Sequence, residues 1–289
     1  MITKKNLLYN FLFRASYKKK IGTYYHLLDP LFHTISGYNM FLNLGYSDGR
    51  VESDITTDQK RMVRVVTANF EKKGNWLDVG CGAGAPACFL AQLYPRITVH
   101  GINIVEHQLE GANMLLKENN FDNRVSFTLG DAQNIPSNSC FYDNVYTIES
   151  AFHFPNKLQF IREAKRVLIS KGKIALADIV LRSHYYKRRD WYKVIIAKHG
   201  LSAKEFYDKK KWMRDLKIEG FKNINTNDIT ENVINVLPKW VAILENNENI
   251  LLDKYPKIFL KMVSKCLQYA YNNKDQNPFG YVLITANKN

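Results

Sequence analysis

The sequence predicts an α/β fold: a mostly parallel sheet of seven strands with helices on both faces and a helical cap. Between residues 75 and 180, short β-branched or apolar runs alternate with segments of helical periodicity, which is the pattern of a parallel sheet covered by helices. A glycine-rich turn follows the first of these runs. The flanking segments 1–70 and 182–217 are rich in aromatic residues and lie outside this alternation, which predicts the cap. A chain of 289 residues is long enough for one large domain with such additions.

Strands are expected where short runs are rich in β-branched and apolar residues. The expected strands are 75–79, 97–104, 125–129, 142–148, 173–179, 221–226 and 279–286. Helices are expected at 85–94, 107–119 and 158–168, with one or two amphipathic helices at 238–273. In open sheets of this kind, ligands bind at the carboxyl ends of the strands. The turns after each strand are therefore the candidate site.

The expected domain organisation is a single core with additions. Residues 1–70 are expected to form an N-terminal helical lid. Residues 71–289 are expected to form the core, with a cap insertion around 182–217 and a helical insertion around 238–273. Tyr24, Tyr25 and Tyr46 are aromatic candidates for closing over a ligand, although packing within the lid explains them equally well.

The net charge of +14 is concentrated in two segments. Residues 1–20 carry six Lys or Arg and no acid, and residues 182–217 carry twelve Lys or Arg against four Asp or Glu. A local positive field would attract an anion or an anionic membrane surface, so we expect an anionic acceptor or a peripheral membrane contact through the basic N-terminus. The expected contributors on the cap are Arg188, Arg189, Lys209, Lys210 and Lys211. A solvated surface is the alternative interpretation.

Other features of the composition exclude several classes of protein. The four cysteines show no Cys-x-x-Cys spacing, so neither a disulfide framework nor a metal site is expected. No run of 18 apolar residues occurs, and we expect no membrane-spanning helix. The N-terminus lacks a clear small-residue cleavage site, and a cytoplasmic protein is expected.

The most specific motif is the segment Asp78-Val79-Gly80-Cys81-Gly82-Ala83-Gly84, between an expected strand and an expected helix. Glycines permit a tight turn and let a ligand approach the main chain. The motif is not a Walker loop, because the closing Gly-Lys-Ser/Thr is missing. Alternating glycines suit a ligand without a diphosphate, such as the amino-acid and ribose parts of S-adenosylmethionine.

The stretch LDVGCGAG resembles the first motif of the class I S-adenosylmethionine-dependent methyltransferases. The resemblance extends over residues 20–288 and is closest to the small-molecule branch, which acts on sugars, sterols, tocopherols, amines and prenyl compounds. The stretches behind this finer assignment are 39–46 (NMFLNLGY), 130–132 (GDA), 149–155 (ESAFHFP), 166–172 (RVLISKG), 228–233 (DITENV) and 280–286. The resemblance implies a Rossmann-like core, S-adenosyl-L-methionine as the cofactor and a small-molecule acceptor.

The resemblance also implies roles at the methionine end of the cofactor. Gly80 and Gly82 would bring the main chain against this end. Asp78 would order the loop or meet the ammonium group through water. Ile148 and Glu149, after the fourth strand, would lie beside the sulfonium.

For the ribose and adenine, the implied residues follow the second and third strands. An acid for the ribose hydroxyls usually ends the second strand, but this sequence has Asn103 followed by Ile104; an amide can both accept and donate a hydrogen bond there. Gln108 would face the ribose. Asp131 would accept from the adenine amino group, or else act as a turn residue, and Ala132 would offer its main-chain NH.

His153 is the main catalytic candidate, because it lies just beyond the fourth strand, where the methyl group should meet the acceptor. A neutral imidazole can take a proton from a hydroxyl, an amine or a carbon acid. A histidine that only packs against the lid is the alternative. Asp178, at the end of the fifth strand, is expected to orient His153 or hold the acceptor, or else to cap the strand end.

Two other functions are compatible with parts of the sequence. An RNA methyltransferase would explain the basic charge, but the residues IESAFHFP after the fourth strand do not resemble the Asn/Asp-Pro-Pro-aromatic motif of base-amine methyltransferases, so no nucleic-acid partner is expected. A non-catalytic cofactor-binding scaffold subunit is disfavoured by the intact glycines. The acceptor molecule, the acceptor atom (O, N or C) and the oligomeric state are left open.

Overall fold

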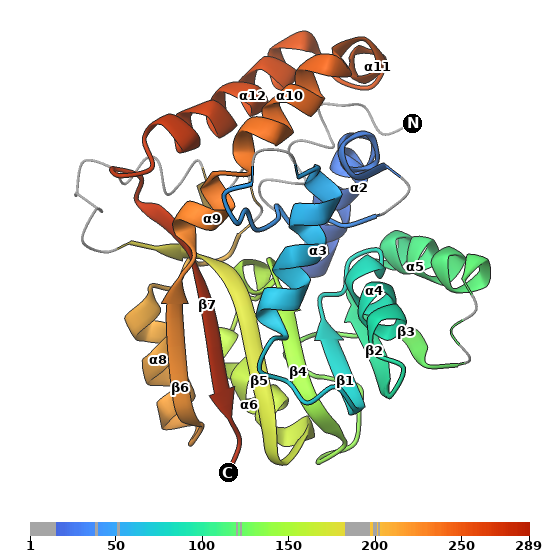
Figure 1. The fold of residues 1–289 in the computed structure, drawn as a ribbon, viewed down its shortest axis with the longest axis vertical. Helices are drawn as coiled ribbons and strands as arrows, with labels where there is room; N and C mark the ends of the chain where they lie inside the picture. The colour runs from blue at the N-terminus through green and yellow to red at the C-terminus, as the bar shows by residue number, and fades with distance from the viewer. Residues whose placement is uncertain are drawn as a thin grey trace.

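The computed structural model describes residues 16–37, 40–50, 53–119, 121, 123–182, 197–198, 201 and 203–289. Its centre is one seven-stranded sheet in the order β3-β2-β1-β4-β5-β7-β6 (Figure 1). The strands are β1 (Gly74–Val79), β2 (Ile97–Asn103), β3 (Val125–Leu129), β4 (Tyr142–Ile148), β5 (Leu168–Leu181), β6 (Lys222–Asp228) and β7 (Phe279–Asn287). Of these seven strands, only β7 runs antiparallel to its neighbours. The predicted mostly parallel α/β fold is confirmed.

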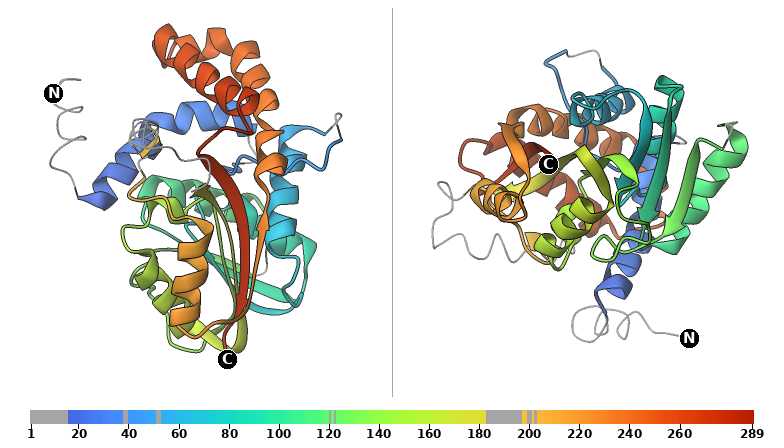
Figure 2. Two further views of the ribbon diagram at one scale, coloured as in Figure 1. Left: turned by 90° about the vertical axis from the view of Figure 1, so that its left-hand side faces the viewer. Right: turned by 90° about the horizontal axis from the view of Figure 1, so that it is seen from below.

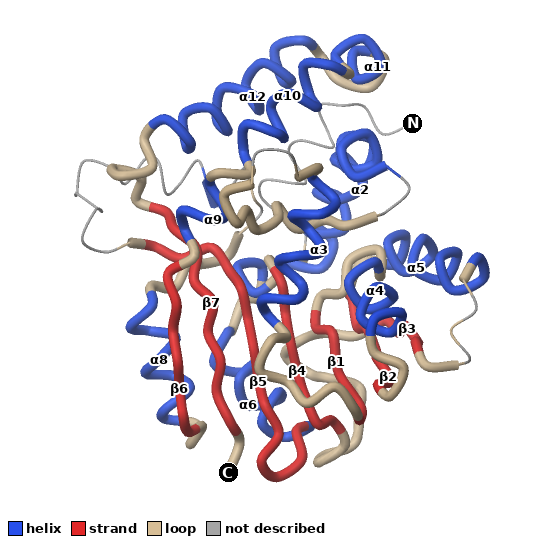
Figure 3. Tube along the Cα trace, viewed as in Figure 1, coloured by secondary structure: helices blue, strands red, loops and turns tan. Residues whose placement is uncertain are grey.

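Helices cover both faces of the sheet, as the alternation of elements predicted (Figure 3). On one face lie α3 (Ile55–Val66), α4 (Ala85–Leu93) and α5 (Glu106–Glu118). On the other lie α6 (Lys157–Val167) and α8 (Lys209–Ile218). Side chains alternate along a strand, so neighbours such as Trp76 and Leu77, both 0% exposed, belong to the two opposite cores.

The cap stands over the carboxyl ends of the parallel strands, as the side view shows (Figure 2). Among the described residues, it consists of helix α2 (Tyr17–Ser36) with α10 (Leu237–Asn246), α11 (Glu248–Leu252) and α12 (Lys257–Asn272). These helices share a third apolar cluster that includes Leu31, Trp240 and Leu260. The short helix α9 (Thr230–Ile234) joins β6 to this cap.

Three details differ from the sequence-based expectations. The end of the expected cap insertion, Lys209–Ile218, is α8, which packs Trp212 into the sheet core instead of covering the site. Likewise α3, within the expected lid, packs on the sheet. The segment 238–273 forms three helices rather than one or two. The first break falls at Asn247, whose side-chain amide donates to the carbonyl of Ile243 and competes with continuation of the helix, and the second precedes α12, which begins after Pro256.

The described part of the chain contains no helix long and apolar enough to cross a membrane. The expected apolar and basic N-terminal segment 1–15 and the cap residues Arg188 and Arg189 lie outside the described residues.

Candidate active site

The glycine-rich turn places bare main chain at the end of β1. Gly80, Gly82 and Gly84 all have positive φ angles, of 77°, 55° and 86°, which side chains of L-residues rarely adopt. A Cβ atom on Gly80 would lie 1.9 Å from the Ser150 hydroxyl oxygen, and one on Gly82 would lie 2.9 Å from Leu42 Cδ1. A side chain on Gly80 or Gly82 would therefore collide with its neighbours, and the turn presents bare main chain.

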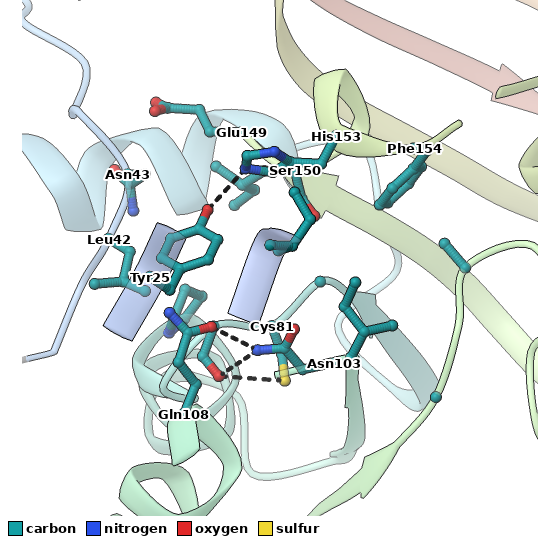
Figure 4. A pocket seen from close by; sticks show the side chains of 18 of the residues that line it. Tyr25, Leu42, Asn43, Cys81, Asn103, Gln108, Glu149, Ser150, His153 and Phe154 are labelled. Carbon is teal, nitrogen blue, oxygen red and sulfur yellow. Dashed lines mark hydrogen bonds between the residues drawn. The ribbon is translucent and has the colours of Figure 1, made fainter. Parts of the chain in front are cut away.

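A cavity opens beside this turn (Figure 4). It is bounded by the ends of β1, β2 and β4, by the start of α5, by residues 40–43 and by the lid helix α2. Eight of the residues expected to bind the cofactor line it directly: Gly80, Gly82, Asn103, Ile104, Gln108, Ala132, Ile148 and Glu149. Segments far apart in the sequence thus converge on one cavity, as predicted for the carboxyl ends of parallel strands.

Asn103 and Gln108 form one polar unit on the cavity wall. The Asn103 amide donates to Gln108 Oε1 at 2.8 Å and to the carbonyl of Gly82 at 3.2 Å (Figure 4). The Gln108 Nε2 atom is buried without a hydrogen bond among the described residues. An unsatisfied buried donor costs roughly 1–3 kcal/mol, so this amide is poised to donate to a ligand oxygen such as a ribose hydroxyl.

Asp131 and Ala132 follow β3, but only Ala132 lines the cavity. One Asp131 oxygen accepts from the main-chain NH of Gln133 at 3.0 Å, and the other lies 3.2 Å from Lys18 Nζ on α2. Asp131 therefore makes the turn contact that was its alternative interpretation, and it also ties the lid to the core. The described contacts leave its role toward adenine a prediction.

Three carboxyl groups lie buried around the cavity. Burial raises the pKa of Glu149 to about 8, with the charge of Asp178 adding to the rise and the Leu44 amide opposing it. Burial likewise raises the pKa of Asp78 to about 7. It also raises the pKa of Asp178, against the nearby positive charge of Lys157. Of the three, only Glu149 lines the cavity; Asp78 and Asp178 lie behind its wall.

Glu149 has further signs of a functional position. Its backbone φ of 51° is unusual for a non-glycine residue, and such strain is concentrated at functional sites. Both its carboxyl oxygens accept from the Leu44 amide, at 3.0 and 3.1 Å. The strain and the two contacts fix the carboxyl group in the cavity wall.

His153 ends a short 3-10 turn, η2 (Ala151–His153), and its side chain is buried at 4% exposure in the cavity wall. Its Nε2 atom lies 3.0 Å from the hydroxyl oxygen of Tyr25, which extends from α2 toward the imidazole (Figure 4). The rings of Tyr24 and Phe152 also contact the imidazole. Aromatic side chains therefore form much of the surroundings of the imidazole.

The aromatic residues expected to close over a ligand lie in different places. Tyr25 lines the cavity together with Tyr17 and Ile21 of the same helix, whereas Tyr46 packs against the core cluster beside α3. Sequence reasoning assigned no role to Asn43, although it lies in the cavity wall at 4% exposure with both polar side-chain atoms unpaired among the described residues. An asparagine in a largely apolar stretch was the only available signal.

The profile of a family described as a methyltransferase domain matches residues 70–235, more than half of the chain. The chain belongs to this methyltransferase family. This chain is 33% identical over 170 residues to methyltransferase GfsG of Streptomyces halstedii, and the match covers 58% of this chain and 60% of GfsG. It is 30% identical over 213 residues to the 27-O-demethylrifamycin SV methyltransferase of Amycolatopsis mediterranei, covering 73% of this chain and 76% of that protein. The predicted use of S-adenosylmethionine agrees with this membership.

Solved structures share the whole architecture. The cyclase SpnF superposes with a TM-score of 0.79 at 22% identity and covers 95% of this chain and 97% of its own. The cyclopropane synthase MmaA2 from Mycobacterium tuberculosis superposes with a TM-score of 0.83 at 13% identity and covers 96% of this chain and 100% of its own. At such identities the likeness shows the fold alone, and it includes the cap as well as the core.

Proposed function

We propose that the methyltransferase transfers a methyl group from S-adenosylmethionine to an O, N or C atom of an apolar small molecule of natural-product, prenyl or lipid type, with His153 as the base. The observation that carries the proposal is the cavity that joins the glycine turn to the aromatic surrounding of His153. The names of two relatives agree with this class of acceptor: 27-O-demethylrifamycin SV methyltransferase and (+)-O-methylkolavelool synthase.

The residues of the cavity fit the cofactor. The main chain at Gly80 and Gly82 would hold its methionine end, and Asn103 with Gln108 would hold the ribose. The cofactor supplies an activated methyl group on a positively charged sulfur. Three buried carboxyl groups with raised pKa values suit a cationic ligand, because a nearby positive charge offsets the cost of burying their charged forms.

The proton chemistry falls to His153 on the acceptor side. A neutral imidazole there takes the acceptor proton as the methyl group arrives, and Tyr25 orients the ring through its hydrogen bond. Asp178 is buried behind the wall at 0% exposure, so we assign it a positioning role. Most of the rate enhancement would come from holding the two reactants in line.

The acceptor is proposed to be apolar because the described cavity wall includes no Lys or Arg. Of the basic residues expected to bind an anion, Lys211 pairs with Glu205 at 2.6 Å and lies over the Tyr207 ring, while Lys209 and Lys210 are exposed at the start of α8. Neutralising Lys209 and Lys210 should leave the KM for the acceptor unchanged. A raised KM would instead favour an anionic acceptor.

The experiment that tests the function offers a trideuteromethyl-labelled cofactor and the purified protein to a metabolite extract, split into organic and aqueous phases. Labelled products are expected in the organic phase, and His153→Ala should form them about 10²–10⁴ times more slowly. Label in RNA that is lost on RNase treatment would favour the RNA alternative, and cofactor binding without any labelled product would favour a scaffold subunit.

The membrane contact through residues 1–20 remains a proposal that rests on the sequence, because most of this segment lies outside the described residues. Apolar residues flanked by lysines suit the surface of an anionic bilayer. Deleting residues 1–20 should abolish binding to vesicles that contain anionic lipid. Undiminished binding would contradict the proposal.

A further inference from the structure

Three side chains of types that can bind a metal meet where the lid helix α2 lies against α5. His26 and Asp29 stand three residues apart on α2 and so share one face of the helix, and His107 lies in the first turn of α5. One ligand atom from each of the three side chains lies within 4.8 Å of the others. They come from two segments about eighty positions apart, which only the tertiary fold brings together.

The contacts within this cluster are not those of an ordinary hydrogen-bonded pair. His107 Nε2 lies 2.8 Å from Asp29 Oδ2, yet this nitrogen is buried and makes no hydrogen bond within the described part of the chain. The carboxylate oxygen is therefore close to the nitrogen but off the direction of an N–H bond. The rings of His26 and His107 meet edge to face, with centroids 5.6 Å apart. The three groups thus border one space from three sides.

Two imidazoles and one carboxylate are a donor set suited to Zn²⁺ and similar divalent transition metals. Zinc binds nitrogen and oxygen at about 2.0–2.2 Å in tetrahedral geometry, so its ligand atoms lie roughly 3.4 Å apart. The exposed side chain of His26 can close the remaining distance by rotation. The sequence does not reveal the cluster, because its ligands lie on two distant segments and none of them is a cysteine.

The cluster lies between two helices that both contribute residues to the active-site cavity. Helix α2 supplies Tyr17, Ile21 and Tyr25 to the active-site cavity, and α5 supplies Gln108, the residue next to His107. A second hollow beside the first is lined by Asp29 and His107 and shares Gln108 with the active-site cavity. A bond between these two helices would therefore hold the lid against the cofactor-binding wall.

We propose that His26, Asp29 and His107 bind one divalent transition-metal ion, with Zn²⁺ as the probe of choice, and that this ion clamps the lid helix to α5. The fourth position of the metal belongs to water. The ion takes no part in methyl transfer, since its ligands lie outside the active-site cavity. Its effect is to slow exchange of the cofactor by restraining α2.

The first test measures binding of ZnCl₂ to tag-free, metal-stripped, full-length protein by calorimetry. One ion per chain is expected, with a dissociation constant of about 1 μM or lower. Asp29→Asn and His107→Ala should each weaken binding at least about tenfold. His33→Asn is the matched control, because His33 lies on α2 and lines the second hollow but is not part of the cluster; its affinity should stay within about twofold of wild type. Absent binding, or equal binding by all variants, would overturn the proposal.

The second test is independent of any loss of folding. Co²⁺ serves as the spectroscopic probe, and His26→Cys places a thiol in the cluster. A new sulfur-to-cobalt charge-transfer band in this variant, absent from the wild type, is expected if residue 26 is a ligand. If the band does not appear while Co²⁺ still binds, residue 26 is not a ligand and the proposed site is wrong.

The clamp itself is tested by the dissociation rate of S-adenosylhomocysteine in stopped-flow displacement. Dissociation should be slower with ZnCl₂ than with a chelator, and His107→Ala should remove the difference. Identical rates with and without zinc in a wild-type protein that binds it would overturn the clamp. Methylation activity is not needed for any of these measurements.

Discussion

Glu149 provides the sharpest link between the structure and a measurement. With a pKa of about 8, this carboxyl group is mostly neutral at pH 6 and half ionised at pH 8. Four groups from different segments interact with it: Asp178 on β5, Tyr281 on β7, Tyr25 on α2 and the Leu44 amide. A bound sulfonium cation would favour the ionised form, so we expect the affinity for S-adenosylmethionine to rise with pH through this range.

The size of the effect follows from the shift in pKa that the ligand causes. If binding lowers the pKa of Glu149 by one unit, the dissociation constant becomes about 5-fold smaller at pH 8 than at pH 6; if it lowers the pKa by three units, about 50-fold smaller. The same linkage predicts release of roughly 0.4 to 0.9 proton per bound cofactor at pH 7. Glu149→Gln, which stays neutral at every pH, should lose this part of the dependence.

Calorimetric titrations at pH 6, 7 and 8, in buffers of different ionisation enthalpy, measure both quantities. S-adenosylhomocysteine is the control ligand, because it lacks the positive charge on sulfur and should show a weaker difference between wild type and variant. Glu149 would not be the titrating group if Glu149→Gln kept the full pH dependence, or if the two ligands lost it equally.

Three further predictions concern the turn, the base and the buried acid of β1. Gly82→Val should weaken cofactor binding at least ~100-fold, or about 2.7 kcal/mol, because the φ angle is 55° and a Cβ atom would press on Leu42; unchanged affinity in a folded variant would remove the role of the turn. His153→Ala should lower turnover by about 10²–10⁴ with cofactor affinity within about threefold, and a variant that keeps more than about a third of wild-type turnover would make His153 a packing residue. Asp78 has a folded pKa of about 7, above its ordinary value of 3.8, so its contribution to stability is present at low pH and is lost as the pH rises toward and through 7. The free energy of unfolding, measured with urea, should therefore decline less steeply between pH 5 and 8 for Asp78→Asn than for the wild type. Equal slopes would contradict a raised pKa of Asp78.

Most of the elements could be predicted because they depend on local patterns. The β-branched run at Ile97 became β2, and the glycine turn after Val79 has the backbone angles that its composition required. Segment 238–273 was harder, because its breaks depend on one side-chain contact at Asn247 and on the start of α12 after Pro256. Periodicity shows that a segment is helical more reliably than where it is interrupted.

In the candidate site, too, residues set by local patterns could be predicted and those set by tertiary packing could not. Gly80, Gly82, Asn103 and Gln108 were found because they follow strands, and the carboxyl ends of parallel strands must meet. Asn43 was missed because its burial beside Glu149 depends on how residues 40–44 return to the sheet. Burial of this kind has no counterpart in the spacing of the sequence.

By itself, the sequence determined the α/β class, the glycine turn and the methyltransferase family, because hydrophobic period, turn chemistry and motif are properties of neighbouring residues. Only the tertiary structure decided that β7 lies antiparallel between β5 and β6 and that Tyr25 meets His153 across 128 positions. It also decided that His26 and Asp29 face His107. Such contacts arise when whole helices and strands bury their apolar faces against one another, and the pKa of a carboxyl such as Glu149 is set by the same burial.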